Sequence, residues 1–83
     1  MATVLFVDGY AIQIYSQDHL PPHVHVFARG CEVIVFLNCL EANVIVRENF
    51  RFKPREMRAI LRIVQENQGL LCEAWERIHD DLD

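Results

Sequence analysis

The stretch that decides the fold is residues 18–38, which read DHLPPHVHVFARGCEVIVFLN. Two segments in it, His23–Ala28 and Glu32–Asn38, consist largely of β-branched and aromatic residues, which favour strands. The pair Arg29-Gly30 separates them, and glycine is common in the tight turns that join antiparallel strands. The stretch therefore predicts a β-hairpin, and the double proline before it predicts a stiff loop.

Further strands are predicted on both sides of this hairpin. Thr3–Val7 and Tyr10–Tyr15 have a similar composition, and the Asp8-Gly9 pair between them is typical of a type I′ turn. Asn43–Val46 predicts a shorter fifth strand. We therefore expect an antiparallel meander of four to five strands within residues 3–47.

The pattern changes at Lys53-Pro54, because proline is favoured at the first position of a helix. Apolar residues then recur at the spacing of one helix face: Met57, Ile60, Leu61 and Val64. Asn67–Gly69 predicts the end of this helix. A second helix follows, with its apolar residues on one face: Leu71, Trp75, Ile78 and Leu82. The predicted fold class is α+β, in which the meander is followed by two C-terminal helices, residues 54–82, packed on one face.

The length of 83 residues predicts a single domain over residues 1–83. Residues 33–37, VIVFL, are apolar without alternation, so both faces of the sheet are expected to be buried. Either a small cognate protein or a second copy of the chain covers the second face, or the curled sheet closes on itself as a partial barrel. The chain lacks the run of roughly 18 apolar residues that a membrane helix needs, and its start lacks the features of a signal peptide. We expect a soluble cytoplasmic protein with no membrane association.

The net charge of −4 conceals a segregation of charge along the chain. Five of the eight basic residues lie between Arg51 and Arg62, whereas six acidic residues and one basic residue lie from Glu66 onward. Within the basic segment, Arg55, Arg58 and Arg62 share one face of the predicted helix. This face suits either solvent or a nucleic-acid backbone.

The three cysteines, Cys31, Cys39 and Cys72, are odd in number and form no CxxC pair. We expect them to be reduced and mostly buried thiols, with neither a disulfide nor a zinc site among them.

Three of the four histidines lie within seven residues of one another. Because side chains at i and i+2 of a strand share a face, His23 and His25 are predicted on one face and the neighbouring valines on the other. With the valines toward the helices, the two histidines lie beside the loop that carries Asp18 and His19. The prolines restrict this loop and confine the four polar side chains to a small volume.

Three interpretations of this cluster remain open. In the first, two imidazoles divide the roles of acid and base, and a carboxylate such as Asp18 fixes a tautomer. Cleavage of RNA by such a pair also needs a cation to stabilise the charge that develops on the phosphate. The candidates for this cation are Arg29, Arg51, Lys53, Arg55 and Arg58.

The second interpretation is a metal site, in which His23 and His25 bind zinc, iron or nickel with His19 or Asp18 as the third ligand. No fourth ligand stands at a predictable spacing. The third is purely structural: the histidines occupy a half-exposed strand face, and Asp18 and His19 hydrogen-bond the loop backbone.

Four segments together resemble a family of small prokaryotic proteins catalogued as a domain of unknown function (family 4160). They are Tyr15-Ser16, the block DHLPPHVHV at 18–26, PREMR at 54–58 and LLCEAWE at 70–76. The resemblance implies a place in two-gene modules similar to type II toxin-antitoxin loci, a functional role for the histidine block and a protein partner. The chain differs from the family over residues 31–47, where a long apolar run replaces a glycine-rich turn and a simple hairpin.

The resulting hypothesis is a small cytoplasmic protein of a toxin-antitoxin-like module that binds RNA or another phosphate-bearing ligand. In the catalytic version of this hypothesis, the protein also cleaves the ligand. The expected catalytic residues are His23 and His25 as acid and base, with Asp18 and His19 orienting them. The expected phosphate-binding residues are Lys53, Arg55 and Arg58, and no metal or other cofactor is assigned. The alternative is a non-catalytic antitoxin or regulatory module that binds a protein through a rigid His-Pro loop.

Overall fold

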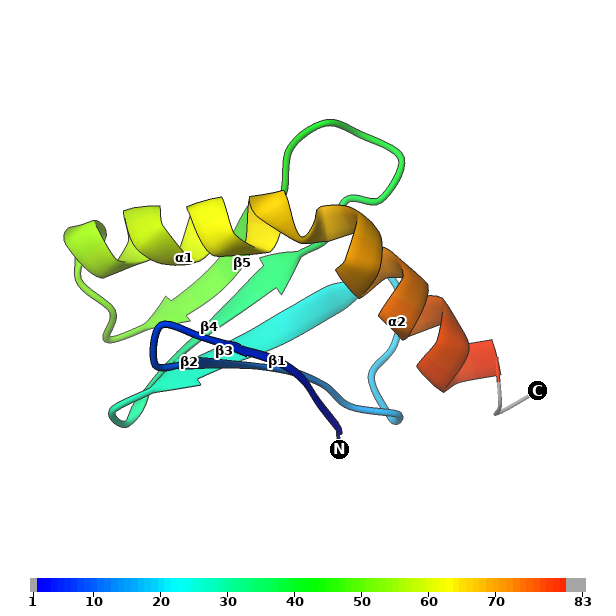
Figure 1. The fold of residues 1–83 in the computed structure, drawn as a ribbon, viewed down its shortest axis with the longest axis horizontal. Coiled ribbons are helices and arrows are strands. Elements are labelled where there is room, and N and C mark those ends of the chain that lie inside the picture. The colour runs from blue at the N-terminus through cyan, green and yellow to red at the C-terminus, as the bar shows by residue number, and fades with distance from the viewer. Residues whose placement is uncertain (1, 81–83) are drawn as a thin grey trace.

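The computed structural model describes residues 2–80 of the chain as one sheet and two helices. The strands are β1 (Ala2–Val7), β2 (Tyr10–Ile14), β3 (His23–Ala28), β4 (Cys31–Phe36) and β5 (Ile45–Phe50), and the helices are α1 (Pro54–Glu66) and α2 (Gln68–Asp80). All neighbouring strands are antiparallel, and the sheet order β1-β2-β3-β4-β5 is that of a meander. Both helices lie on one side of the sheet (Figure 1). The predicted α+β fold is confirmed.

The two tight turns expected from glycine occur where they were predicted. Asp8 and Gly9 between β1 and β2 have φ angles of 53° and 85°, and Arg29 and Gly30 between β3 and β4 have φ angles of 49° and 78°. Positive φ at both central residues is the property of a type I′ turn, whose twist matches that of the flanking strands. The second turn sets the register in which His23 pairs with Phe36, and His25 with Ile34.

The fifth strand differs from the prediction, because it covers Ile45–Phe50 and not Asn43–Val46. Its later residues include Arg47, Glu48 and Asn49, all exposed, so the strand has no apolar signal there. β5 forms an edge of the sheet, and its backbone pairing with β4 defines it. A register shift between Ile34 and Val35 accompanies this pairing.

The junction of the helices also differs from the prediction. A single residue, Asn67, separates α1 from α2, and Gly69 lies inside the first turn of α2 instead of ending α1. The Asn67 side chain donates a hydrogen bond of 2.8 Å to the Ile63 carbonyl and so satisfies a carbonyl at the end of α1. The expected position of Leu82 on the apolar face of α2 lies outside the described residues.

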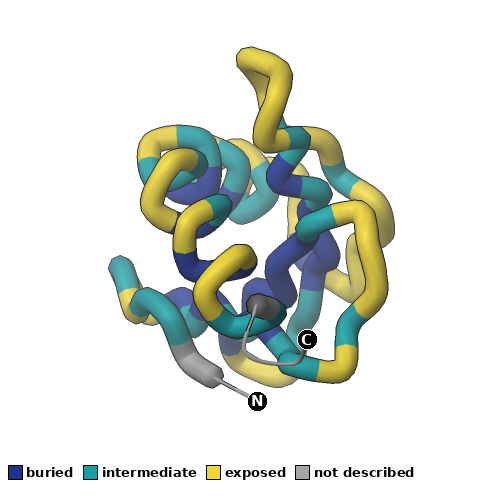
Figure 2. Tube along the Cα trace, turned by 90° about the vertical axis from the view of Figure 1, so that its right-hand side faces the viewer, coloured by how far each residue is buried: buried dark blue, intermediate teal, exposed yellow. Residues whose placement is uncertain are grey.

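The core lies between the helices and the sheet, where Figure 2 shows the buried parts of the trace meeting. It combines Val24 and Val26 of β3 with residues of both helices, among them Ile60, Leu71 and Trp75. Within residues 2–80 the sheet is open, with β1 and β5 at its edges, so the expected alternative of a partial barrel is wrong. Neither described helix has the length and apolar character to cross a membrane.

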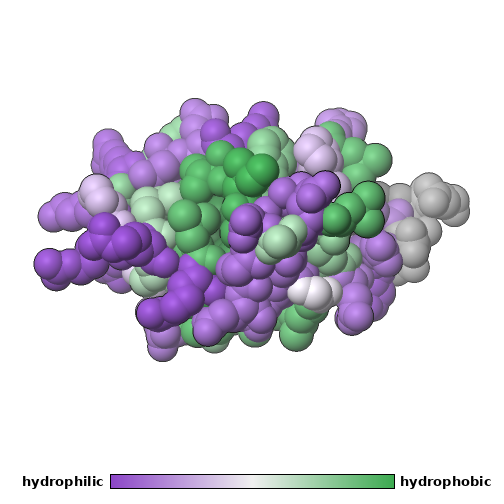
Figure 3. All heavy atoms as spheres, turned by 90° about the horizontal axis from the view of Figure 1, so that it is seen from above, coloured by the Kyte–Doolittle hydropathy of each residue, from purple (hydrophilic) through white to green (hydrophobic). Residues whose placement is uncertain are grey.

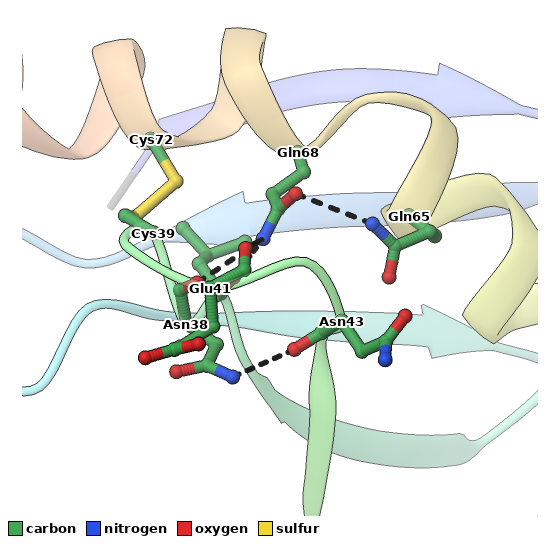
Figure 4. The surroundings of a disulfide bond; sticks show 8 residues. Asn38, Cys39, Glu41, Asn43, Gln65, Gln68 and Cys72 are labelled. Atoms are coloured by element: carbon green, nitrogen blue, oxygen red, sulfur yellow. Dashed lines mark hydrogen bonds between the residues drawn. A yellow bond between two sulfur atoms is a disulfide. The ribbon is translucent and has the colours of Figure 1, made fainter.

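The prediction of three reduced cysteines is wrong, because Cys39 and Cys72 form a disulfide. Their separation of 33 residues gave no local signal. The loop after β4 is held against the helix junction by Gln68, whose amide donates to the carbonyls of Leu37, Asn38 and Glu41 (Figure 4). This places Cys39 next to the first turns of α2, with a Cα–Cα distance of 6.0 Å to Cys72. Cys31 remains a free thiol.

Candidate functional site

Asp18, His23 and His25 meet at the end of the sheet where β3 begins. The Nε2 atoms of His23 and His25 lie 3.2 and 3.0 Å from the same oxygen, Oδ2 of Asp18. The strand puts both histidines on the face away from the core valines, as predicted, and the loop before β3 brings Asp18 over them. Both imidazoles are buried, with exposed fractions of 4% for His23 and 8% for His25, so the half-exposed strand face of the structural interpretation is wrong.

The second ring nitrogen of each histidine is also engaged. Nδ1 of His23 lies 2.9 Å from the carbonyl oxygen of Pro21, and Nδ1 of His25 lies 2.9 Å from Oε2 of Glu32. A carbonyl oxygen and an ionised carboxylate only accept hydrogen bonds, so both Nδ1 atoms act as donors. The two rings are thus fixed in orientation, and each directs Nε2 toward Asp18.

Aromatic rings and a third histidine enclose the cluster. Tyr15 packs on His25 with a centroid distance of 4.5 Å, and Trp75 of α2 packs on His23 with a centroid distance of 5.3 Å. His79, one turn after Trp75, stacks on the indole and places Nε2 3.2 Å from the backbone carbonyl of Asp18. α2 reaches past the sheet to this loop (Figure 1), so it holds both the ring of His23 and the backbone of Asp18.

The pKa of Tyr15 is affected by burial and by the charges of the cluster. Burial raises the pKa of the Tyr15 phenol, and the carboxylates of Glu32 and Asp18 add to the rise. The carboxylates of Asp18 and Glu32 thus lie beside both the phenol and the imidazole of His25.

A pocket of about 340 Å³ opens on one side of the cluster. It is lined by Asp18 and His23 from the cluster and by His19 and Arg47, both exposed. His19, predicted to orient the other histidines, therefore lies at the rim of the pocket. Arg47 of β5 is the cation that this pocket contains.

The predicted phosphate-binding residues lie elsewhere. Lys53, Arg55 and Arg58 are exposed around the start of α1 and do not line this pocket. α1 begins at the end of the molecule away from α2 (Figure 1), and Figure 3 shows hydrophilic residues gathered at that end. The basic face of α1 and the histidine cluster therefore form two separate surfaces.

Four residues around the site were absent from the sequence prediction: Glu32, Arg47, Tyr15 and His79. Glu32 could have been found, since the Arg29-Gly30 turn pairs it with Phe27, diagonally across from His25 on the same face. Tyr15 ends a predicted strand, and its position in the sequence does not indicate its contact with His25. Arg47 and His79 depend on the register of an edge strand and on the docking of α2, and neither follows from local spacing.

No match was found among curated proteins, and none was found among solved structures. Residues 9–76, which include every residue of the cluster and most of α2, match the model of one protein family. The chain therefore belongs to the family described as Domain of unknown function (DUF4160).

Proposed function

We propose that this chain is a cytoplasmic component of a toxin-antitoxin-like module, and that it binds RNA or another phosphate-bearing ligand in the pocket beside the histidine cluster. The observation that carries the proposal is the placement of Arg47 and His19 around that pocket, next to the buried His23. An arginine presents donors in the fork geometry that suits phosphate oxygens, and an imidazole supplies a further donor.

The proposed roles follow the contacts of each imidazole. His23 borders the pocket and is the residue that we assign to proton transfer, with the exposed His19 as the second imidazole. His25 has carboxylates at both ring nitrogens, so we assign it the role of a positioning residue for Asp18. Arg47 is the residue assigned to stabilise the charge that develops on a phosphate under attack.

The proposed compartment is the cytoplasm. Because reducing compartments keep thiols unpaired, the Cys39–Cys72 bond would form there only under oxidising conditions.

Arg47→Ala is expected to weaken the binding of labelled single-stranded RNA about tenfold at low salt, because one charge-assisted contact to phosphate is lost. The slope of log affinity against log salt concentration is expected to fall by about 0.7, the value for one phosphate contact to a single strand. Fluorescence anisotropy over a series of salt concentrations measures both quantities.

The matched control is the double substitution Arg55→Ala and Arg58→Ala, which removes exposed arginines from the other basic surface. We expect this control to bind RNA like the wild type. If the control loses affinity for RNA and Arg47→Ala does not, the RNA phosphates bind along α1 and not at the pocket. If the wild type shows no salt-dependent binding, the proposal of a phosphate-bearing ligand is wrong.

An apolar groove supports the alternative function, a non-catalytic module that binds a protein. The groove measures about 630 Å³ and lies between the loop after β4 and the two prolines. Leu40 and Ile45, which line it, have exposed fractions of 97% and 52%. Large apolar side chains that are this exposed mark surfaces for protein partners.

Expression in a bacterial host distinguishes the two functions. If the chain is an RNA-cleaving toxin, induction of the wild type is expected to arrest growth, and a folded His23→Ala variant is expected to permit it. If the chain is an antitoxin or regulator, the wild type is expected to permit growth, and Leu40→Glu is expected to abolish co-purification with the product of the adjacent gene. Circular dichroism of each variant checks its fold, and growth arrest by both the wild type and His23→Ala would contradict a catalytic role for His23.

A further inference from the structure

The geometry points to a binding site for a divalent first-row transition-metal ion, with His23 Nε2, His25 Nε2 and Asp18 Oδ2 as its three protein ligands. These three atoms all lie within 4.8 Å of one another. The site goes beyond RNA binding, and its test needs no RNA.

The hydrogen bonds at Nδ1 prepare both imidazoles for coordination. Because each Nδ1 donates its proton, to Pro21 or to Glu32, the neutral form of each ring has its lone pair on Nε2. Metal-bound histidines commonly show this pattern, in which a carbonyl or carboxylate accepts the other ring proton and fixes the tautomer. Here both partner types occur, one on each ring.

The position of Asp18 is difficult to explain with neutral imidazoles alone. Its Oδ2 atom is an acceptor and lies within 3.2 Å of two Nε2 atoms that are also acceptors. A cation among the three atoms converts these contacts into attractive ones. Two protons on the rings would also do so, which is why the test must distinguish ion binding from protonation.

Two of the three distances between ligand atoms suit a transition-metal ion. Such an ion binds imidazole nitrogen and carboxylate oxygen at about 2.0–2.2 Å, so neighbouring ligand atoms lie roughly 3.0 Å apart at octahedral angles and roughly 3.4 Å apart at tetrahedral angles. The two nitrogen–oxygen distances, 3.0 and 3.2 Å, agree with these values.

The charges indicate a divalent ion. With neutral imidazoles, the carboxylates of Asp18 and Glu32 contribute two negative charges, and their side chains have exposed fractions of only 19% and 31%. One divalent ion neutralises both.

The ligand types select the class of metal. Two imidazoles and one carboxylate suit zinc, iron(II) and related ions, whereas magnesium and calcium prefer oxygen ligands. Three protein ligands leave further coordination positions open, and the pocket lined by His19 and Arg47 is adjacent to Asp18 and His23. If the ion is bound, His23 is one of its ligands, and His19 becomes the imidazole available for proton transfer.

The test is titration of EDTA-treated wild-type protein with Zn²⁺ by calorimetry and with Co²⁺ by visible absorption. We expect one ion per chain and d–d bands without a thiolate charge-transfer band. At free Zn²⁺ 100 times the dissociation constant, the melting temperature is expected to rise by roughly 10–20 °C, and Mg²⁺ is expected to have no such effect.

Substitutions identify the residues that bind the ion. Asp18→Ala and His25→Ala are expected to lose stoichiometric binding, and Glu32→Gln, which keeps all three ligands, is expected to weaken it 10- to 100-fold. His19→Ala and Cys31→Ser are the controls and are expected to bind like the wild type. Arg47→Ala is expected to retain the ion, so a failure of RNA binding is distinguishable from a failure of metal binding.

Three results would overturn the site. They are the absence of stoichiometric binding by the wild type, binding that survives in folded Asp18→Ala and His25→Ala, and binding that disappears in Cys31→Ser. If the alanine variants do not fold, Glu32→Gln and the Zn²⁺-dependent melting temperature of the wild type decide. A Zn²⁺ affinity that Glu32→Gln leaves unchanged would mean that the ion binds elsewhere, and a wild-type melting temperature that Zn²⁺ leaves unchanged would exclude the ion.

Discussion

Cys72→Ser is expected to lower the free energy of unfolding by about 3–4 kcal/mol under oxidising conditions, because the disulfide closes a loop of 33 residues in the unfolded chain. For a chain of this size, the melting temperature is expected to fall by about 15 °C or more. Chemical denaturation of the wild type and the variant, each with and without a reducing agent, measures the difference. The reducing agent is expected to destabilise the wild type by the same amount and to leave the variant unchanged.

Cys31→Ser is the matched control, because Cys31 is the free thiol. We expect it to change the free energy of unfolding by no more than about 0.5 kcal/mol. Thiol titration of the denatured wild type gives an independent measure: one thiol is expected before reduction and three after it. Three thiols before reduction, together with a free energy of unfolding that the reducing agent does not change, would show that Cys39 and Cys72 are not bonded.

The disulfide illustrates what the sequence could not predict. Turns and strands were accessible because their causes are local, as in Asp8-Gly9, where the composition implies the positive φ angles that the structure has. The Cys39–Cys72 contact has no local cause. It depends on Gln65 and Gln68, whose side chains bind the backbone of the loop after β4, including the carbonyls of Ala42 and Glu41.

β5 shows a second limit of sequence reasoning. Its residues Arg47, Glu48 and Asn49 are exposed, and an edge strand is held by backbone hydrogen bonds to one neighbour. Backbone pairing does not require a particular pattern of side chains, so the strand predicted from the sequence ended at Val46 and not at Phe50. For the same reason, Arg47, the positively charged residue that lines the pocket, was not predicted as a site residue.

The central residues of the candidate site could be predicted from the sequence, whereas the residues that surround them could not. The i and i+2 spacing in a strand put His23 and His25 together, and the proline loop returned Asp18 to them. The contact between His23 and the Pro21 carbonyl is local, whereas the contacts from Glu32 in β4 and from Trp75 in α2 cross the fold. Spacing along the chain therefore predicted the three polar groups but not Glu32, the partner that fixes the tautomer of His25.

Trp75→Ala is expected to lower the free energy of unfolding by about 3–5 kcal/mol, because the indole is 4% exposed and belongs to the core. The indole also packs on His23 and stacks on His79, so its loss removes one ring contact from each imidazole. Urea denaturation followed by circular dichroism measures the difference. Trp75→Phe is expected to lose less, because a ring still fills part of the space.

Glu76→Ala is the matched control, since Glu76 is the exposed neighbour of Trp75 in the same helix. We expect its free energy of unfolding to stay within about 0.5 kcal/mol of the wild type. Because Trp75 is the single tryptophan of the chain, the wild type is expected to emit at the short wavelengths of a buried indole and to shift to longer wavelengths on unfolding. Emission typical of an exposed indole, with a loss below about 1 kcal/mol in Trp75→Ala, would instead mean that Trp75 is held at the surface, where an aromatic of its size can anchor a partner.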